Sequence, residues 1–228
     1  MTDKTQPEET VEVEAKPTFD GLGIYPELLK RLTDLGFMHP TPIQHAAIPV
    51  GTKGEDMIGI AQTGTGKTLA FSIPMIQRIS ETKGMGLILL PTRELALQVE
   101  EILKKVGQAF GMRTAVLIGG ASMYPQVKDL KNKPHIIVAT PGRLIDHIEQ
   151  RNVSLSNIRI LVLDEADRML DMGFEPQIKK ILGQVPKERQ TMLFSATMPS
   201  KISQIGEMYM KKTTSNRNCS ARNNCGSY

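Results

Sequence analysis

The 228-residue sequence is poor in cysteine and in aromatic side chains. It contains no tryptophan, and its only two cysteines, Cys219 and Cys225, lie close together in a polar C-terminal stretch. Two such cysteines provide neither a disulfide framework nor the ligand spacing of a structural zinc site. Four histidines are scattered along the chain, at His39, His45, His135 and His147. Their spacing favours surface or structural roles over metal binding.

Long apolar runs are also absent from the sequence. None approaches the roughly 20 residues that a membrane-spanning helix needs, and the N-terminus lacks the pattern of a secretory signal peptide. A hydrophobic content of 40% and a charged content of 23% are typical of a globular protein. A chain of this length can bury the core of one substantial domain. We therefore expect an intracellular protein, in the cytoplasm or the nucleus, with no membrane partner.

The net charge of +4 is unevenly distributed. Residues 1–16 hold five acidic and two basic residues, whereas residues 211–228 hold four basic residues and no acid. Residues 17–210 contain the remaining 22 basic and 19 acidic residues. A body this mildly basic is compatible with nucleic acid binding but does not by itself argue for it.

One glycine-containing turn is the most informative stretch of the sequence. It follows an apolar run at 57–60, precedes a helix-like segment at 69–73, and consists of Ala61, Gln62, Thr63, Gly64, Thr65, Gly66, Lys67 and Thr68. This setting is typical of a phosphate-binding loop, whose backbone N–H groups surround an anionic oxygen. Lys67 would reach the β- and γ-phosphates, and the Thr68 hydroxyl would complete a Mg²⁺ shell. Ala61 replaces the glycine of the strict pattern but is small enough for the turn; the alternative is an ordinary glycine-rich turn.

Strands and helices alternate along the rest of the chain. Short apolar runs occupy residues 57–60, 86–90, 115–118, 136–139, 160–163 and 191–194, as expected for strands covered on both faces. Repeated βα units predict an α/β fold with a mostly parallel sheet and helices on both faces. Ligands bind at the carboxyl ends of the strands in such sheets, and polar clusters follow these ends here.

A pair of acids follows the strand expected at 160–163. Asp164 would project from a buried strand into a cleft, where it could hold Mg²⁺ through water, opposite Thr68. Glu165 would orient or deprotonate an attacking water. The alternative is a strand-end carboxylate that caps the next helix. The phosphate loop about one hundred residues upstream in the same sheet favours the nucleotide interpretation.

Seven motifs in order give the chain a family resemblance. They occupy residues 36–44, 61–68, 91–96, 119–120, 140–143, 164–167 and 195–197. In sequence and spacing they strongly resemble the N-terminal RecA-like domain of DEAD-box RNA helicases, a P-loop NTPase fold, from Phe19 to about residue 210. The resemblance implies an RNA-stimulated ATPase that unwinds RNA duplexes locally, with ATP and Mg²⁺ as cofactors.

The resemblance also implies roles for individual residues. Gln44 would read the adenine edge, Phe37 would stack on the base, and Phe19 would add to the adenine pocket, which implies ATP over GTP. Sequence-independent contacts to the RNA backbone would come from Pro91, Thr92, Arg93, Glu94, Gly119, Gly120, Thr140, Pro141, Gly142 and Arg143. Ser195 and Thr197 would couple the nucleotide state to the RNA side through hydrogen bonds toward Asp167. Helix caps, turn glycines and strand-end hydroxyls are the structural alternatives at these positions.

The expected organisation is a disordered acidic arm at 1–17, a RecA-like ATP-binding domain at 18–211, and a disordered or artificial tail at 212–228. Nothing after Thr197 resembles the second RecA-like domain of the family. We therefore expect the chain alone to bind nucleotide but to be nearly inactive. Two alternatives are a nucleotide- or RNA-binding module without catalysis and another P-loop motor, such as a DNA translocase. Gln44 and the acidic run 164–167 favour the RNA helicase over the translocase.

Overall fold

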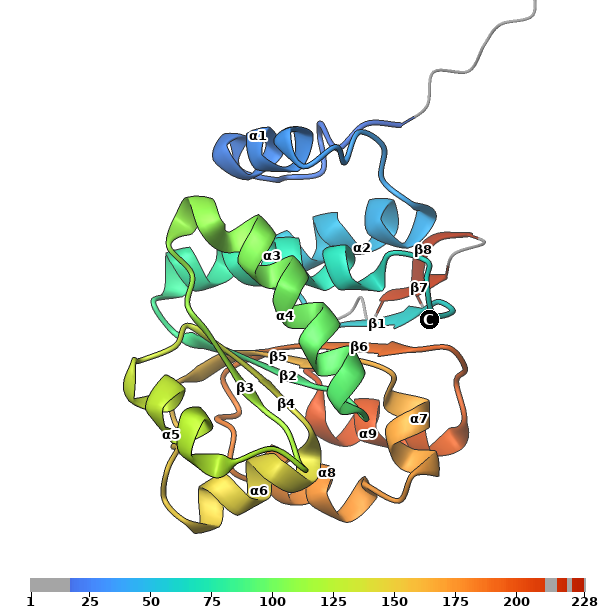
Figure 1. The fold of residues 1–228 in the computed structure, drawn as a ribbon. Helices are drawn as coiled ribbons and strands as arrows, with labels where there is room; N and C mark the ends of the chain where they lie inside the picture. Colours follow the sequence, from blue (N-terminus) through green and yellow to red (C-terminus); the bar gives the residue numbers. More distant parts are fainter. Residues whose placement is uncertain (1–16, 212–216, 221–222, 228) are drawn as a thin grey trace, which may run out of the picture.

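The computed structural model describes residues 17–211, 217–220 and 223–227, and the acidic arm at 1–16 lies outside these residues (Figure 1). Its body is a parallel sheet of six strands: β1 Met57–Ile60, β2 Met85–Leu89, β3 Thr114–Leu117, β4 Ile136–Ala139, β5 Ile158–Leu163 and β6 Gln190–Ser195. The order across the body is β3-β4-β2-β5-β6-β1. The predicted α/β fold with a mostly parallel sheet is confirmed.

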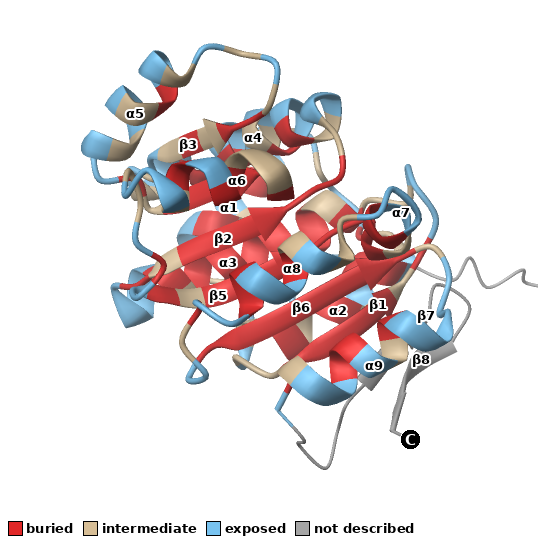
Figure 2. Ribbon diagram, turned by 90° about the horizontal axis from the view of Figure 1, so that it is seen from below, coloured by how far each residue is buried: buried red, intermediate tan, exposed pale blue. Residues whose placement is uncertain are grey.

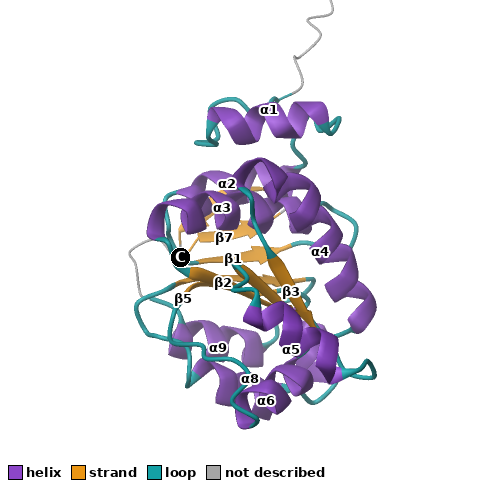
Figure 3. Cartoon of the chain, turned by 60° about the vertical axis from the view of Figure 1, so that its left-hand side comes forward, coloured by secondary structure: helices purple, strands orange, loops and turns teal. Residues whose placement is uncertain are grey.

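Helices cover both faces of this sheet (Figure 3). One face carries α1 Pro26–Asp34, α2 Pro42–Thr52, α3 Lys67–Thr82 and α4 Arg93–Gly107, which is followed by the 3₁₀ turn η1 Gln108–Phe110. The other face carries α5 Met123–Lys131, α6 Pro141–Glu149, α7 Ala166–Asp171, α8 Glu175–Leu182 and α9 Ser200–Tyr209.

The central strands are apolar on both faces because each face is buried. Ile88 and Val162 belong to the core under α1–α4, whereas their neighbours Leu89 and Leu163 belong to the core under α6–α9. Successive side chains of a strand point to opposite faces, so a continuous apolar run feeds two cores at once. Figure 2 shows these strands as buried along their length.

The N-terminal segment is attached to this body by side-chain bonds to α3. Gln77, which is 3% exposed, accepts a hydrogen bond from the Tyr25 N–H and donates one to the Gly23 carbonyl, both at 3.0 Å. Helix α1 is amphipathic and buries Leu28 and Leu32. The segment before the first motif therefore belongs to the folded domain.

Two strands lie where the sequence predicts a disordered tail. β7 Arg217–Ser220 pairs in parallel with β1, and β8 Asn223–Ser227 pairs antiparallel with β7. These two segments are strands in the structure, while residues 212–216, 221–222 and 228 of the predicted tail lie outside the described part. Strand pairing uses backbone groups, so it needs no apolar periodicity, and the free edge of β1 offers such groups.

The order of the strands divides the motifs into two sets. The phosphate loop, the acidic pair and the motif at 195–197 follow β1, β5 and β6, which are neighbours. The motifs at 91–94, 119–120 and 140–143 follow β2, β3 and β4, which form the other half of the sheet. Both sets lie at the carboxyl edge.

No helix among the described residues is long and apolar enough to cross a membrane.

Candidate functional site

The glycine-containing turn adopts the geometry of an anion-binding loop. Gly64 and Gly66 have φ values of 84° and 92°, which side-chain-bearing residues rarely adopt. Lys67 is the first residue of α3, so the turn passes directly into the helix N-terminus. A Cβ on Gly66 would lie only 2.4 Å from the side-chain nitrogen of Gln44. Glycine is therefore required here both for the backbone conformation and for the close approach of α2.

Lys67 lies against the two acids that follow β5. Its Nζ is 2.6 Å from Glu165 Oε1 and 3.8 Å from Asp164 Oδ1, and all three side chains are nearly fully buried. Thr63 Oγ1 also donates to Glu165 Oε1, at 3.0 Å. The structure thus brings together residues nearly one hundred positions apart in the sequence. One cation and two carboxylates form a compact charged cluster above the ends of β1 and β5.

Burial raises the pKa of Asp164 to about 6; the Lys67 ammonium opposes this shift, and the Glu165 carboxylate adds to it. The Asp164 carboxylate accepts a hydrogen bond from the Glu165 N–H at 2.9 Å. Glu165 has a φ of 53°, a left-handed conformation that costs roughly 1–2 kcal/mol for a residue with a Cβ. Strained residues of this kind concentrate at functional sites.

The oxygen ligands at this site suit Mg²⁺ better than they suit a metal ion held entirely by protein side chains. Thr68 and Asp164 line the same cavity. The described residues contain no group of three or more histidine, cysteine, aspartate or glutamate side chains that could hold a metal ion. Mg²⁺ commonly keeps several waters and takes one or two carboxylates together with substrate phosphates. A site with so few protein ligands is consistent with that mode of binding.

A cavity of about 510 Å³ lies beside the charged cluster. Of the residues predicted to bind nucleotide, it is lined by Phe37, Gln44, Thr63, Gly64, Gly66, Lys67, Thr68, Asp164 and Glu165. Sequence reasoning missed its other lining residues, His39, Thr41, Leu69, Leu95, Gln98, Val99 and Ile102. Four of these come from α4, on which the sequence predicted no nucleotide-binding residue. The cavity has the size typical of small-molecule sites.

Phe19 does not line this cavity. Its ring is 5% exposed and belongs to the core under α1–α4. Ala61, Gln62 and Thr65 also do not line the cavity, although they belong to the loop. The segment before α1 buries this ring in the core, and the contribution of Phe19 to the adenine pocket stays a prediction.

Gln44 is hydrogen-bonded within the protein through both ends of its amide. Its Oε1 accepts from the Thr41 N–H at 2.9 Å, and its Nε2 donates to the Gly66 carbonyl at 3.0 Å. These bonds connect the N-terminus of α2 to the phosphate loop. Phe37 is half-buried at the cavity wall. The predicted contact of Gln44 with a base would require at least one of its present bonds to exchange.

The motifs after β2, β3 and β4 converge through two arginines. A Cβ on Gly120, where φ is 67°, would lie 2.4 Å from Arg93 Nη1. Arg143 Nη1 donates to the Ala121 carbonyl at 3.0 Å. Thr92 caps α4 by accepting from the Leu95 N–H at 3.3 Å, as the structural alternative proposed.

The remaining residues of these motifs lie around the helix starts that follow the strands. Pro91 and Thr140 are buried, and Pro141 opens α6. Glu94 and Gly120 are exposed, while Gly119 and Gly142 are half-buried.

A buried histidine connects α5 and α6, the helices beside the motifs at 119–120 and 140–143. His147, on α6, bonds through Nε2 to Gln126 Oε1 at 3.0 Å. The Gln126 amide nitrogen donates to the Ile118 and Ser122 carbonyls, so Oε1 is the acceptor and His147 Nε2 carries the proton. Burial, and then the charge of Arg143, lowers the pKa of His147. Neutral His147 therefore joins α5 and α6, and the sequence offered only its isolation as a clue.

Thr197 contacts Asp167 as the sequence predicted. Its N–H and its hydroxyl donate to Asp167 Oδ2, at 3.0 and 2.9 Å. Partial burial alone would raise the pKa of Asp167, but the hydrogen bonds of Thr197 and the Arg168 N–H hold it below its ordinary value. The buried Ser195 hydroxyl also lowers this pKa, although it forms no hydrogen bond of ordinary geometry in the described part of the chain. The structure thus connects the ends of β5 and β6 through Thr197.

Known proteins share both the sequence and the fold. The sequence model of the DEAD/DEAH box helicase family matches residues 41–205. The ATP-dependent rRNA helicases RRP3 of Debaryomyces hansenii and rrp3 of Schizosaccharomyces pombe are each 49% identical, over 86% and 84% of this chain. The chain covers 42% of each of these relatives, so it spans about two fifths of their length.

Two solved structures give the same result for the fold. The DEAD box protein from the hyperthermophile Methanococcus jannaschii superimposes with a TM-score of 0.81 at 40% identity, covering 86% of this chain and 54% of that one. The yeast DEAD-box splicing factor Prp28 gives 0.79 at 36% identity, covering 86% and 50%. The family match spans most of the sequence, and the fold agrees with that of two members. The chain belongs to the DEAD/DEAH box helicase family.

Proposed function

We propose that this chain is the ATP-binding and hydrolysing half of an ATP-dependent RNA helicase that unwinds RNA duplexes locally. The observation that carries this proposal is the cluster in which Lys67, from the phosphate loop, lies between the two acids after β5. A loop that binds phosphate and an acid that binds Mg²⁺ must face the same cavity in a nucleotide-hydrolysing site. The relatives named above are ATP-dependent rRNA helicases, which supports an RNA substrate.

Each residue of the cluster has a role in this proposal. Lys67 exchanges its contact with Glu165 for the β- and γ-phosphates, which frees the Glu165 carboxylate to orient or deprotonate the attacking water. Asp164 and Thr68 would hold Mg²⁺, largely through water, and the bound ion would neutralise charge on the phosphates. The N-terminus of α3 adds its positive dipole end to the loop. Gln62, Thr63 and Thr65 provide the remaining backbone N–H groups of the loop.

Adenine selection is assigned to the end of the cavity near α2. Phe37 and Gln44 line this end. Gln44 would offer one donor and one acceptor to the base, once its present bonds to Thr41 and Gly66 exchange. The exchange would also release the phosphate loop, so that base recognition and loop geometry would change together. A guanine base presents the opposite donor and acceptor pattern at the corresponding edge.

RNA binding is assigned to the half of the carboxyl edge formed by β2, β3 and β4. The N-termini of α4 and α6, the Thr92 hydroxyl and the guanidinium groups of Arg93 and Arg143 are suited to phosphate and sugar contacts. Such contacts are independent of base sequence. Asp167 and Thr197, which are hydrogen-bonded to each other after β5 and β6, are assigned the coupling of this half to the nucleotide cavity.

The chain covers 42% of the length of these two relatives. The activity of the whole protein is therefore also a proposal. By the family resemblance, a second RecA-like domain would supply arginines to the γ-phosphate. In comparable NTPases an arginine of this kind contributes roughly 10³–10⁵ in rate. We expect residues 18–211 alone to bind ATP and ADP but to hydrolyse ATP slowly. We also propose that the whole protein acts inside the cell, in the cytoplasm or the nucleus.

Nucleotide titrations test the proposal. Binding of ATP and GTP with Mg²⁺ should favour ATP, and Lys67→Ala should weaken triphosphate binding by roughly 10²-fold. The exposed lysine variant Lys187→Ala is the matched control and should bind as the parent does. Equal affinities for ATP and GTP, or unchanged binding by Lys67→Ala, would contradict the proposal.

Hydrolysis assays separate the alternatives. RNA and DNA should both produce little stimulation of ATP hydrolysis by this chain alone. Fast RNA-stimulated turnover would show that a second domain is not needed. Preferential stimulation by DNA would instead support a DNA translocase.

A further inference from the structure

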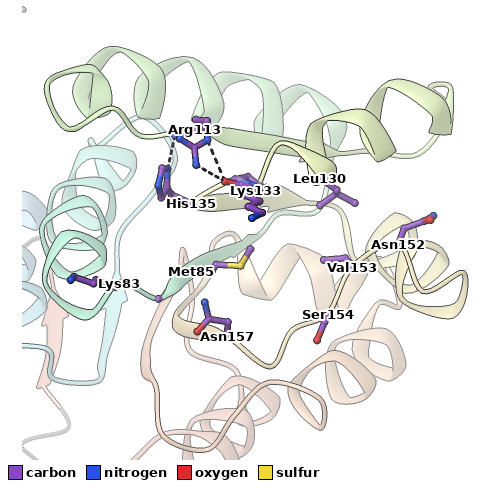
Figure 4. A pocket seen from close by; sticks show the side chains of 12 residues that line it. Lys83, Met85, Arg113, Leu130, Lys133, His135, Asn152, Val153, Ser154 and Asn157 are labelled. Atoms are coloured by element: carbon purple, nitrogen blue, oxygen red, sulfur yellow. Dashed lines mark hydrogen bonds between the residues drawn. The ribbon is translucent and has the colours of Figure 1, made fainter.

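A second cavity, of about 430 Å³, lies at the amino edge of the sheet (Figure 4). We call it the basal pocket; its lining includes Lys83, Met85, Arg113, Lys133, His135 and Asn157. Met85 begins β2, and Arg113, His135 and Asn157 directly precede β3, β4 and β5. The six residues of β5 separate this edge from Asp164 by roughly 20 Å, at about 3.3 Å per residue. The basal pocket is therefore distinct from the nucleotide cavity and shares no lining residue with it.

The basal pocket has three kinds of wall. Figure 4 shows Arg113, Lys133 and His135 together on one side, with Ser154 and Asn157 on the other. Met85 lies between the two sides, and Val153 and Leu130 add apolar surface. A pocket that combines apolar surface with a few polar or positively charged side chains is typical of a small-ligand site.

The cations of the basal pocket have no carboxylate partner. No aspartate or glutamate lines it, and Lys83, Arg113 and Lys133 form no ion pair within the described part of the chain. The Arg113 guanidinium is held by backbone carbonyls, through Nε to Asn132 at 3.1 Å and through Nη2 to Lys133 at 2.9 Å. A charged group that is already fixed loses less conformational entropy when it binds an anion.

A second cation-rich cavity at the same edge provides a contrast. It has about 170 Å³ and is lined by Arg78, Arg189 and Lys211 among others. Arg78 pairs with Glu81, and Lys211 pairs with Glu188. Arg189 donates to Thr191 and to two backbone carbonyls. Arg78 and Lys211 therefore have carboxylate partners, whereas no carboxylate pairs with Lys83, Arg113 or Lys133 within the described part of the chain.

We propose that the basal pocket binds the phosphate monoester of a nucleotide unit, either free or at the end of an RNA strand. A phosphate monoester carries about −1.5 to −2 charges at neutral pH and suits the Arg113 guanidinium and the Lys133 ammonium group, with Lys83 standing apart near the end of α3 (Figure 4). Met85 and Val153 provide apolar surface for a base, and Asn157 provides an amide for its edge. The volume of the basal pocket lies within the range of about 300–1,000 Å³ common for small-ligand sites.

His135 completes the cationic side as a neutral donor. Its Nδ1 lies 3.0 Å from the Arg113 N–H and accepts from it, which leaves Nε2 as the nitrogen that carries the proton. Burial, and then the charge of Arg113, lowers the pKa of His135. The ring is thus neutral at physiological pH and can donate one hydrogen bond without adding charge.

Lys83 and Lys133 can be replaced without backbone strain. Lys83 and Lys133 both have a φ of 52°, a conformation that asparagine adopts more readily than most residues. Lys83→Asn and Lys133→Asn should therefore remove a charge without destabilising the fold. Arg151 has a φ of 59° and does not line the basal pocket, so Arg151→Asn is the matched control.

The test is an NMR titration of the ¹⁵N-labelled chain with AMP, with adenosine, and with a short single-stranded RNA bearing a 5′-phosphate or a 5′-hydroxyl. AMP and the 5′-phosphorylated RNA should shift the amide signals of Gly84, Met85 and Ser154. Each lysine variant should bind roughly fivefold more weakly, and Arg151→Asn should bind as the parent does. Tighter binding of AMP would identify a free nucleotide as the source, and tighter binding of the RNA would identify a strand end.

Three results would overturn this proposal. Unchanged binding by both lysine variants would remove the role of the cations, and shifts confined to Gly64 and Thr68 would place AMP at the phosphate loop instead. Inorganic phosphate binding as tightly as AMP would show that no nucleoside is recognised. A glutamate-rich peptide that displaces AMP and binds more tightly would assign the basal pocket to an acidic protein segment.

Discussion

Replacing Asp164 with asparagine should stabilise the ligand-free protein at neutral pH. Burial raises the pKa of this carboxyl from 3.8 to about 6, because attraction to Lys67 offsets the loss of hydration only in part and Glu165 adds repulsion. The charged form is therefore less favourable in the folded protein than in the unfolded chain. A shift of about two pKa units corresponds to about 3 kcal/mol. Lys67 keeps its 2.6 Å contact with Glu165 in the variant, so no buried cation loses its only partner.

The pH dependence gives this prediction its sign. Because the folded pKa lies above the unfolded one, the cost of the charge is complete above pH about 6 and disappears below pH about 4. Asp164→Asn should therefore exceed the parent in free energy of unfolding by about 3 kcal/mol at pH 7.5 and by about 1 kcal/mol at pH 4.5. Urea unfolding followed by circular dichroism, without nucleotide or Mg²⁺, measures both values.

Asp167→Asn, in the same acidic run, is the control with the opposite sign. Although partial burial raises the pKa of Asp167, hydrogen bonds from Thr197 and the Arg168 N–H lower it overall. Its stabilising effect is present above the unfolded pKa and is lost as the pH falls through the lowered folded value. Asp167→Asn should therefore destabilise the protein about equally at pH 7.5 and pH 4.5, and less only as the pH falls below the unfolded pKa of 3.8. An Asp164→Asn variant no more stable than the parent at pH 7.5 would refute the reasoning.

Three further substitutions test the site. Gln44→Ala removes hydrogen bonds to Thr41 and Gly66, so we expect a loss of about 1–3 kcal/mol in unfolding free energy and a smaller preference for ATP over GTP in binding titrations. Phe19→Ala should cost about 3 kcal/mol of stability yet leave that preference unchanged, because its ring is buried in the core; a changed preference would return Phe19 to the base pocket. Gly120→Ala would displace Arg93, so RNA affinity measured by fluorescence anisotropy should fall roughly tenfold while ATP affinity is unchanged; an equal loss of both would indicate general misfolding.

Much of the candidate site could be predicted because its signals are local. The phosphate loop needs glycines at fixed positions, followed by Lys67 and Thr68, and all of these lie within eight residues. The parallel sheet followed from short apolar runs with helical segments between them. Once the strands are parallel, their carboxyl ends share one edge, so the meeting of Lys67 with Asp164 needed no knowledge of the strand order.

The contacts of individual side chains were less predictable. An amphipathic helix shows that it has a buried face but not which element covers it, and so the α4 wall of the nucleotide cavity was missed. Phe19 was expected near adenine, yet the same apolar ring serves equally well in the core, where the structure places it. Gln44 bonds to the backbone of Thr41 and Gly66, two contacts that the sequence did not predict.

The sequence by itself determined the fold class, the family and the positions of the motifs along the chain, because glycine conformations, apolar periodicity and strand-to-loop order are properties of neighbouring residues. Only the tertiary structure decided that the nucleotide motifs occupy the β5-β6-β1 half of the sheet and the other motifs the β3-β4-β2 half. It alone paired β7 with β1 and gathered unpaired cations in the basal pocket. The physical reason is that strand partners and ion-pair partners are chosen among groups distant in sequence, by the packing of the whole chain.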